Sequence, residues 1–343
     1  MNSKLFNKEN SLRNSINEGP SLVEAGLLYS IVALLLITLG THVQNKSFTT
    51  GILITEYIII LVPSLLLLMI REYNIKKVLR LNRVSFLNLF IILSMMFFSI
   101  WVVAIVNIFN LWLINTIFGN VIVPPLPISE TPLLVSLLLI GVSAGICEEV
   151  MFRGVIQRSF ERFGKVFSIV ITGFVFGLFH MDFQKLIGTF LLGVLIGFIV
   201  YRTNSLYAGM FAHFTNNSIA VLVNYISGKI TPSDMSAIQA NENVLNDYFN
   251  TLGAMPSFQK IAVIGVWLGI AVFCSAALAG LIWAFIRNTS TTDKSILSSS
   301  TGKVLPGILA YLPGLIIVIV VYAIIGLNLA GIPFNFLLMT IRL

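Results

Sequence analysis

The chain has 343 residues, of which 57% are hydrophobic and only 10% are charged, and its mean hydropathy is +0.95. This composition excludes an ordinary soluble domain, in which about 25% of the residues carry a charge. The formal net charge of +7 needs no nucleic-acid partner, because orientation against an anionic inner leaflet accounts for it. We therefore expect a multi-pass protein of the cell membrane that is surrounded by lipids.

Apolar runs long enough to cross a bilayer recur along the whole chain. A helical span needs about 20 residues, and the runs that approach or exceed this length cover residues 24–41, 50–70, 85–108, 131–151, 165–181, 185–201, 205–227, 258–287 and 304–329. The sequence thus predicts an all-α fold of about nine transmembrane helices with a central bundle that carries the functional residues. Most Lys and Arg residues then lie on the side of the amino terminus, which predicts that this terminus is cytoplasmic.

The linkers divide the predicted helices into four regions. Residues 1–120 form an amino-terminal region of three membrane helices, which ends where four prolines occur within residues 120–132. A central region over residues 130–227 follows. We expect an outer loop at 228–257 and carboxy-terminal membrane helices at 258–343.

Ionisable and amide side chains gather in the central region, where a bilayer tolerates few of them. Each ionised group at the middle of a bilayer costs about 2.5 to 3.5 kcal/mol on insertion scales. Such a cost is difficult to explain unless the groups act together. The residues concerned are Glu148, Glu149, Arg153, His180, His213 and Asn217.

Helical spacing predicts how these side chains face one another. Glu149 and Arg153 are four residues apart and can pair, whereas Glu148 is turned about 100° away and stays free. Gly164 is a natural turn that lies sixteen residues from both Glu148 and His180. An antiparallel hairpin around this glycine would place these two side chains at about the same depth.

Three short motifs carry a resemblance to a known family. Residues 148–153 read EExxxR, residues 176–180 read FxxxH and residues 213–217 read HxxxN. In this order and on successive apolar runs, they resemble the signature motifs of the CPBP family of intramembrane proteases. That family includes type II CAAX prenyl endopeptidases and bacterial Abi proteins linked to bacteriocin processing or immunity. The resemblance makes the central region a CPBP/Abi-like protease core.

The resemblance implies hydrolysis of a peptide bond in a membrane-associated or leader-peptide substrate. Glu148 would activate a water molecule as a glutamate-type general base, and His180 would hold this water or donate to the oxyanion. His213 and Asn217 would complete the oxyanion hole. The implied catalytic residues are thus Glu148, Glu149, His180, His213 and Asn217, with Arg153 and Phe176 as supporting residues.

The sequence leaves two alternatives for a cofactor. We expect none, because the chain has no HExxH motif and Asn is a poor zinc ligand. A zinc ion held by Glu148, His180 and His213 is the alternative, and Glu149 would then serve as the base.

Two other classes of function are also open. The protein could be a catalytically silent membrane scaffold that regulates a partner, such as a membrane or cell-wall enzyme. It could also be an ion-coupled transporter, for which paired and repeat-related broken helices would be expected. The substrate of an active protease would be a peptide or a membrane protein segment. Its identity cannot be derived from the sequence.

Overall fold

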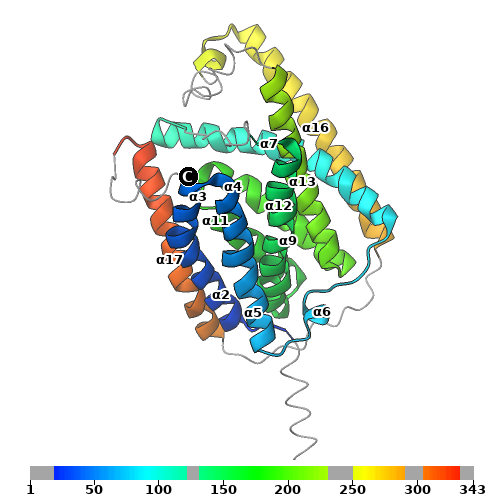
Figure 1. The fold of residues 1–343 in the computed structure, drawn as a ribbon. Coiled ribbons are helices and arrows are strands. Elements are labelled where there is room, and N and C mark those ends of the chain that lie inside the picture. The colour runs from blue at the N-terminus through cyan, green and yellow to red at the C-terminus, as the bar shows by residue number, and fades with distance from the viewer. Residues whose placement is uncertain (1–18, 122–130, 231–249, 290–303, 333–343) are drawn as a thin grey trace, which may run out of the picture.

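The computed structural model describes residues 19–121, 131–230, 250–289 and 304–332. Within these ranges every regular element is a helix, and most helices run side by side in one bundle (Figure 1). The expected all-α, multi-pass architecture is therefore confirmed. Most of the predicted outer loop and most of the proline-rich linker lie outside the described residues.

Seven helical segments of the described chain are long and apolar enough to cross a membrane, so the expected number of nine is not confirmed. They are Leu22–Lys46 (α2, η1 and α3), Phe48–Ile70 (α4, η2 and α5), Phe86–Phe118 (α7), Leu133–Phe163 (α8 to η5), Phe183–Thr203 (α12), Ser257–Asn288 (α16) and Val304–Leu329 (α17).

The other two expected spans are helical but differ from ordinary transmembrane helices. Helix α11, Lys165–Phe179, has 15 residues. At about 1.5 Å per residue it is shorter than the roughly 30 Å of a hydrocarbon core. Helix α13, Leu206–Ile230, is long enough, but the polar run at residues 213–218 lowers its hydropathy. Phe176 lies on α11, His180 directly follows this helix, and His213 and Asn217 lie on α13. The two unusual helices therefore coincide with the predicted site.

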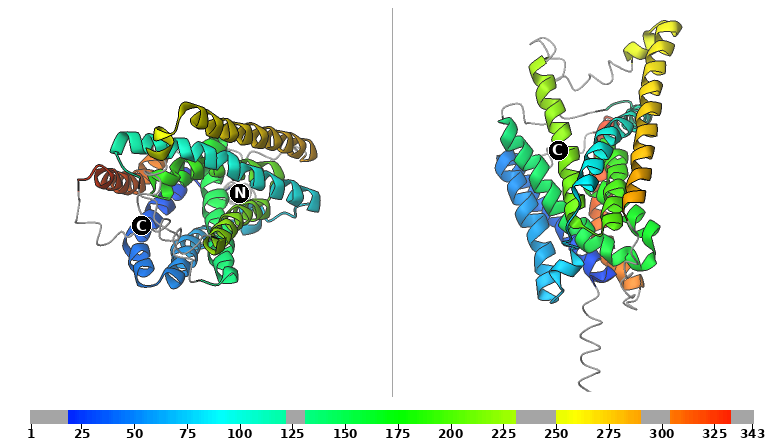
Figure 2. Two further views of the ribbon diagram at one scale, coloured as in Figure 1. Left: turned by 90° about the horizontal axis from the view of Figure 1, so that it is seen from above. Right: turned by 90° about the vertical axis from the view of Figure 1, so that its right-hand side faces the viewer.

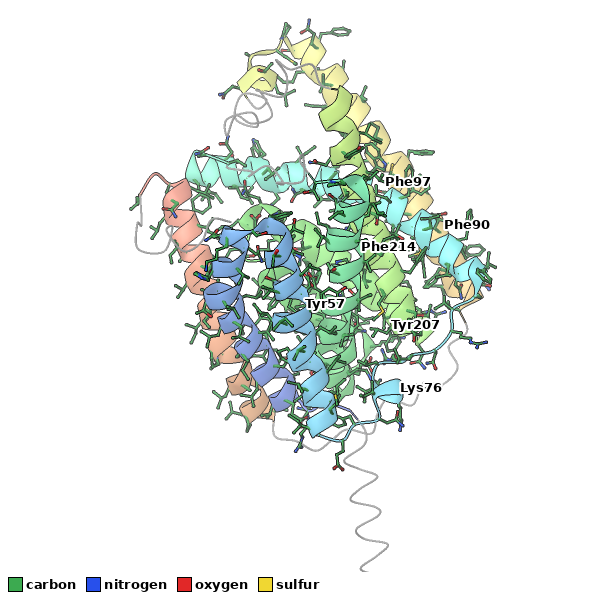
Figure 3. The ribbon with its side chains drawn as sticks, viewed as in Figure 1. Tyr57, Lys76, Phe90, Phe97, Tyr207 and Phe214 are labelled. Atoms are coloured by element: carbon green, nitrogen blue, oxygen red, sulfur yellow. The ribbon has the colours of Figure 1, made fainter. Side chains whose placement is uncertain are left out.

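The outer surface of the bundle is apolar. Phe90 and Phe97 on α7 are among the exposed large hydrophobic side chains (Figure 3). Helix α16 lies along α7 on the same side of the bundle (Figure 2). Such a surface suits the acyl chains of a bilayer and supports the assignment to a membrane.

The first long helix is fixed against the last one. The hydroxyl of Ser30 on α2 donates to the carbonyl oxygen of Ala310 on α17 at 2.7 Å and accepts from the N–H of Gly314 at 3.0 Å. A Cβ atom on Gly26 would lie 2.9 Å from the carbonyl carbon of Ala310, so only glycine permits this approach. The two ends of the described chain therefore support each other beside the central helices.

The central helices form the expected hairpin. Gly164 has φ +99°, a conformation that favours glycine, and it separates Phe163 from the start of α11. Helices α11 and α12 then pack closely, because a Cβ atom on Gly193 would lie 2.9 Å from the Cα atom of Gly173. This packing holds the carboxyl end of α11 against the segment that contains the two glutamates.

Candidate active site

Glu149 joins three helices at the centre of the site. Its side chain is fully buried, and its Oε1 accepts from Nη1 of Arg153 at 2.7 Å and from Nδ1 of His213 at 2.9 Å. Nη2 of Arg153 donates to the carbonyl oxygen of Gly193 on α12 at 2.9 Å. The spacing of Glu149 and Arg153 predicted their ion pair, whereas the bond to His213 was not predicted.

Helix α13 approaches Glu149 closely because Gly209 lies one turn before His213. A Cβ atom at Gly209 would be 2.9 Å from Oε2 of Glu149 and 2.4 Å from a methyl carbon of Val200. The absence of a side chain at this position therefore permits the bond between His213 and Glu149.

Phe176 separates the two histidines. The guanidinium carbon of Arg153 lies 4.7 Å from the centre of the phenyl ring, which is a cation–π contact. The ring of His180 lies edge-on at 4.7 Å, and that of His213 at 5.8 Å, between ring centres. Phe176 is itself fully buried, so it fixes the positions of its polar neighbours.

The orientation of His180 is set by the backbone of its own helix. Its Nδ1 lies 2.9 Å from the carbonyl oxygen of Phe176. A carbonyl oxygen only accepts hydrogen bonds, so Nδ1 carries the proton. Nε2 of the neutral ring is then an acceptor.

Glu148 has the free carboxylate of the cluster. Its side chain is 13% exposed, and its Oε2 is buried without a hydrogen-bond partner in the described chain. The distance from this oxygen to Nε2 of His213 is 3.9 Å, which is too long for a hydrogen bond. His213 therefore lies between two glutamates, bonded to Glu149 and facing Glu148.

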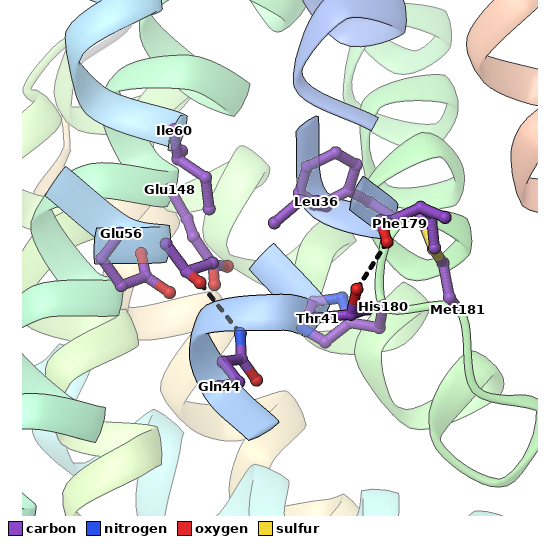
Figure 4. A pocket seen from close by; sticks show the side chains of 11 residues that line it. Leu36, Thr41, Gln44, Glu56, Ile60, Glu148, Phe179, His180 and Met181 are labelled. Atoms are coloured by element: carbon purple, nitrogen blue, oxygen red, sulfur yellow. Dashed lines mark hydrogen bonds between the residues drawn. The ribbon is translucent and has the colours of Figure 1, made fainter. Parts of the chain in front are cut away.

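Glu148 and His180 border one cavity of about 220 Å³ (Figure 4). Such a volume has room for several water molecules. The first two membrane-spanning segments supply the rest of its wall together with the end of α11. The lining residues are Leu36, Ile37, Thr41, Gln44, Thr55, Glu56, Ile60, Glu148, Phe179, His180 and Met181.

Sequence reasoning missed the polar residues that the first two segments contribute. Glu56 is buried beside Glu148 in the wall of the cavity, and Nε2 of Gln44 donates to Oγ1 of Thr55 at 2.9 Å. The available signal was a lone carboxylate inside the apolar run ITEYIIIL, since an ionisable residue within a span indicates a functional site.

Asn217 is one of the predicted site residues that do not line the cavity, whereas Glu148 and His180 do. Its Nδ2 donates to the carbonyl oxygen of Ile140 at 2.9 Å, and its Oδ1 accepts from Asn216 at 3.1 Å. His213, which precedes it by one helical turn on α13, does not line the cavity either.

The residues do not fit a zinc ion as they are arranged. Among the residues that the structure describes, no group of three His, Cys, Asp or Glu side chains could hold a metal ion. The alternative set of Glu148, His180 and His213 is therefore not preassembled as a metal centre.

The fold and the cluster define a class. It is a multi-pass helical membrane protein whose buried Glu–His–Arg cluster lies beside a cavity. In agreement with this, the model of the family "Type II CAAX prenyl endopeptidase Rce1-like" matches residues 130–219. This segment contains all the motif residues, so the resemblance to the CPBP/CAAX protease family is confirmed for it. No curated protein and no solved structure matches the chain.

Proposed function

We propose that the protein is an intramembrane endopeptidase that hydrolyses a peptide bond in a membrane-associated or leader-peptide substrate. The main support is that the free carboxylate of Glu148 and the ring of His180 border the same cavity. Both lie in the segment that matches a protease family. A silent scaffold would not need these groups to stay together beside a cavity.

The first step is the activation of water between Glu148 and His180. The carboxylate of Glu148 removes a proton from the water, while Nε2 of His180 accepts its second hydrogen as a hydrogen bond. The water oxygen bonds to the carbonyl carbon of the peptide, and the carbonyl oxygen becomes an oxyanion. Glu148 then gives its proton to the nitrogen of the leaving amine as the C–N bond breaks. General acid–base catalysis of this kind contributes about 10² to 10⁴ in rate.

The oxyanion needs hydrogen-bond donors, and His213 is the first candidate. Its Nδ1 is bonded to Glu149, which leaves Nε2 directed toward Glu148 and the substrate. With protons on both nitrogens, His213 donates from Nε2 to the oxyanion. The charges of Glu148, Glu149, Arg153 and His213 then sum to zero, which lowers the cost of burying them.

Asn217 is the second donor in this proposal. One N–H of its amide is bonded to the carbonyl oxygen of Ile140, and an amide carries two such hydrogens. The second hydrogen can reach the oxyanion if the substrate extends past His213 along α13. Each step of this mechanism uses only side chains of the described residues, and the absence of a metal stays a prediction.

Purified protein in detergent, tested against a panel of fluorogenic, leader-type and CAAX-type peptides, checks this function. We expect Glu148→Gln to lose at least about 10²-fold in kcat/KM, because the base is removed. Glu72→Gln is the matched control, since Glu72 is an exposed glutamate at the end of α5.

Two further outcomes test the dependence on a metal and the peptidase activity itself. Activity that persists in a strong chelator supports the metal-free mechanism, whereas activity lost in the chelator requires a different one. If the folded wild-type protein cleaves none of the peptides, the proposal fails and the scaffold becomes the better explanation. Any role in bacteriocin processing or immunity stays a prediction that the cleaved peptides would test.

A further inference from the structure

Glu56 is a buried carboxylate without a partner in the cavity. It belongs to η2, Ile54–Leu61, and is 8% exposed. Its Oε2 is buried and has no hydrogen bond, and Glu56 forms no ion pair with any residue that the structure describes. Figure 4 shows its side chain beside Glu148 at the edge of the cavity. It lies outside the segment that the family model matches.

The wall that carries Glu56 has a defined structure. Nε2 of Gln44 on α3 donates to Oγ1 of Thr55, which joins the two segments beside the cavity. A Cβ atom on Gly51 would lie only 2.4 Å from the Cα atom of Gln44, so the turn between them depends on glycine. The helix around Glu56 is widened to a π-helix, a feature that is frequent at functional sites.

The wall of the cavity offers Glu56 no cationic partner. Two glutamates border it, and no Lys or Arg side chain is among the described residues that line it. The guanidinium of Arg153 is bound to Glu149 and to the carbonyl oxygen of Gly193, so it cannot neutralise Glu56. A buried ionised carboxylate without a partner is strongly unfavourable. A cation supplied from outside the chain would remove this penalty.

We propose that Glu56 forms a subsite for a basic side chain of the substrate, Lys or Arg, close to the peptide bond that is cleaved. This inference rests on the proposed function. The ammonium or guanidinium group would donate charge-assisted hydrogen bonds to the free oxygen of Glu56. An acidic side chain or a free carboxyl terminus at the same place would face two glutamates and bind poorly. The selected substrates are therefore basic near the cleavage site.

Three sets of peptides test the subsite. The fluorogenic peptides of the three sets differ at one position, which is Lys in the first set, norleucine in the second and Glu in the third. Within each set, this position is placed in turn at each of the four residues on either side of the cleaved bond. At one position we expect wild type to cleave the Lys peptide about 10 to 100 times better in kcat/KM than the norleucine peptide. Glu56→Gln should lose this preference and cleave the norleucine peptide within about threefold of wild type. Glu72→Gln should behave as wild type.

Charge reversal provides a second variant. Glu56→Lys should prefer the Glu peptide over the Lys peptide at the same position. Size-exclusion profiles and melting temperatures in the same detergent show whether each variant is folded. If neither variant folds, the preference of the wild type decides alone, and the absence of a preference for Lys overturns the proposal. An equal loss for all three peptides in folded Glu56→Gln also overturns it, because that result indicates a structural role.

Binding measurements distinguish a failure of the basic subsite from a failure of the proposed peptidase activity. If wild type cleaves no peptide, the affinities of dye-labelled Lys and norleucine peptides for wild type and Glu56→Gln in nanodiscs are measured by fluorescence polarisation. Tighter binding of the Lys peptide that is lost in the variant supports the subsite even without cleavage. Equal binding of both peptides to wild type overturns it.

Discussion

The segment that matches the protease family contains a buried set of paired charges around Glu149, whereas the first two membrane-spanning segments contribute only a buried carboxylate that has no ionic partner in the described chain. In the family segment, Arg153 and His213 both bond to the buried Glu149, while the neighbouring Glu148 borders the cavity as the proposed base. In the amino-terminal segments, Glu56 has no ionic partner in the described chain and faces the cavity. Paired charges hold a structure together, whereas an unpaired charge beside a cavity is available for a ligand. Breaking the Glu149–Arg153 pair should therefore lower the stability of the fold. Changing Glu56 or its surroundings should alter which substrates are preferred.

The largest effect is expected where a buried pair is broken. Arg153→Met leaves Glu149 charged in an apolar interior and removes the bond to Gly193, which should lower the free energy of unfolding by about 3 to 5 kcal/mol. Thermal unfolding in detergent measures this change. The double variant Glu149→Gln/Arg153→Met should recover part of the loss, because no unpaired charge remains. A single variant as stable as wild type would contradict the paired role.

A smaller effect, confined to catalysis, is expected at Asn217. Loss of one oxyanion donor typically reduces the rate by about 10² to 10³, so Asn217→Ala should lose kcat with little change in KM. Asn216→Ala is the matched control, since its Nδ2 donates to Asn217 and it precedes the predicted donor by one position. If both variants keep wild-type kcat, the oxyanion hole does not include α13 beyond His213.

The smallest effect is expected in the wall that carries Glu56. Thr55→Val removes the hydrogen bond from Gln44, and a single neutral bond contributes about 0.5 to 1.5 kcal/mol. We expect KM for a Lys-containing peptide to rise by up to about tenfold with kcat nearly unchanged. Ser94→Ala on the exposed side of α7 is the control. A fall in kcat with constant KM would instead connect Thr55 with the chemical step.

The sequence predicted the parts of the site that depend on spacing within one helix or one hairpin. Four residues separate Glu149 from Arg153, and the structure contains the corresponding ion pair. The equal distances of Glu148 and His180 from Gly164 predicted a similar depth, and both side chains line the same cavity. Local geometry is sufficient for such inferences, because the helical repeat and a glycine turn fix the relative positions.

The parts that could not be predicted depend on contacts between distant segments. Glu56 reaches the cavity because the first two membrane-spanning segments pack against the central helices, and no periodic pattern in the sequence indicates that packing. The bond from Asn217 to the carbonyl oxygen of Ile140 depends on how α13 is rotated against a preceding helix. The division of the chain into four regions stays a prediction.

The packing of α2 against α17 has a consequence for the order in which the protein matures. The residues joined by the Ser30 to Ala310 bond are 280 positions apart, and the segment that begins with α2 contributes Leu36, Ile37 and Gln44 to the cavity. During synthesis α2 enters the membrane long before α17 exists. One wall of the cavity therefore gains part of its support only after α17 has been inserted. Delayed completion of this kind would keep the proposed peptidase inactive while other chains are entering the same membrane.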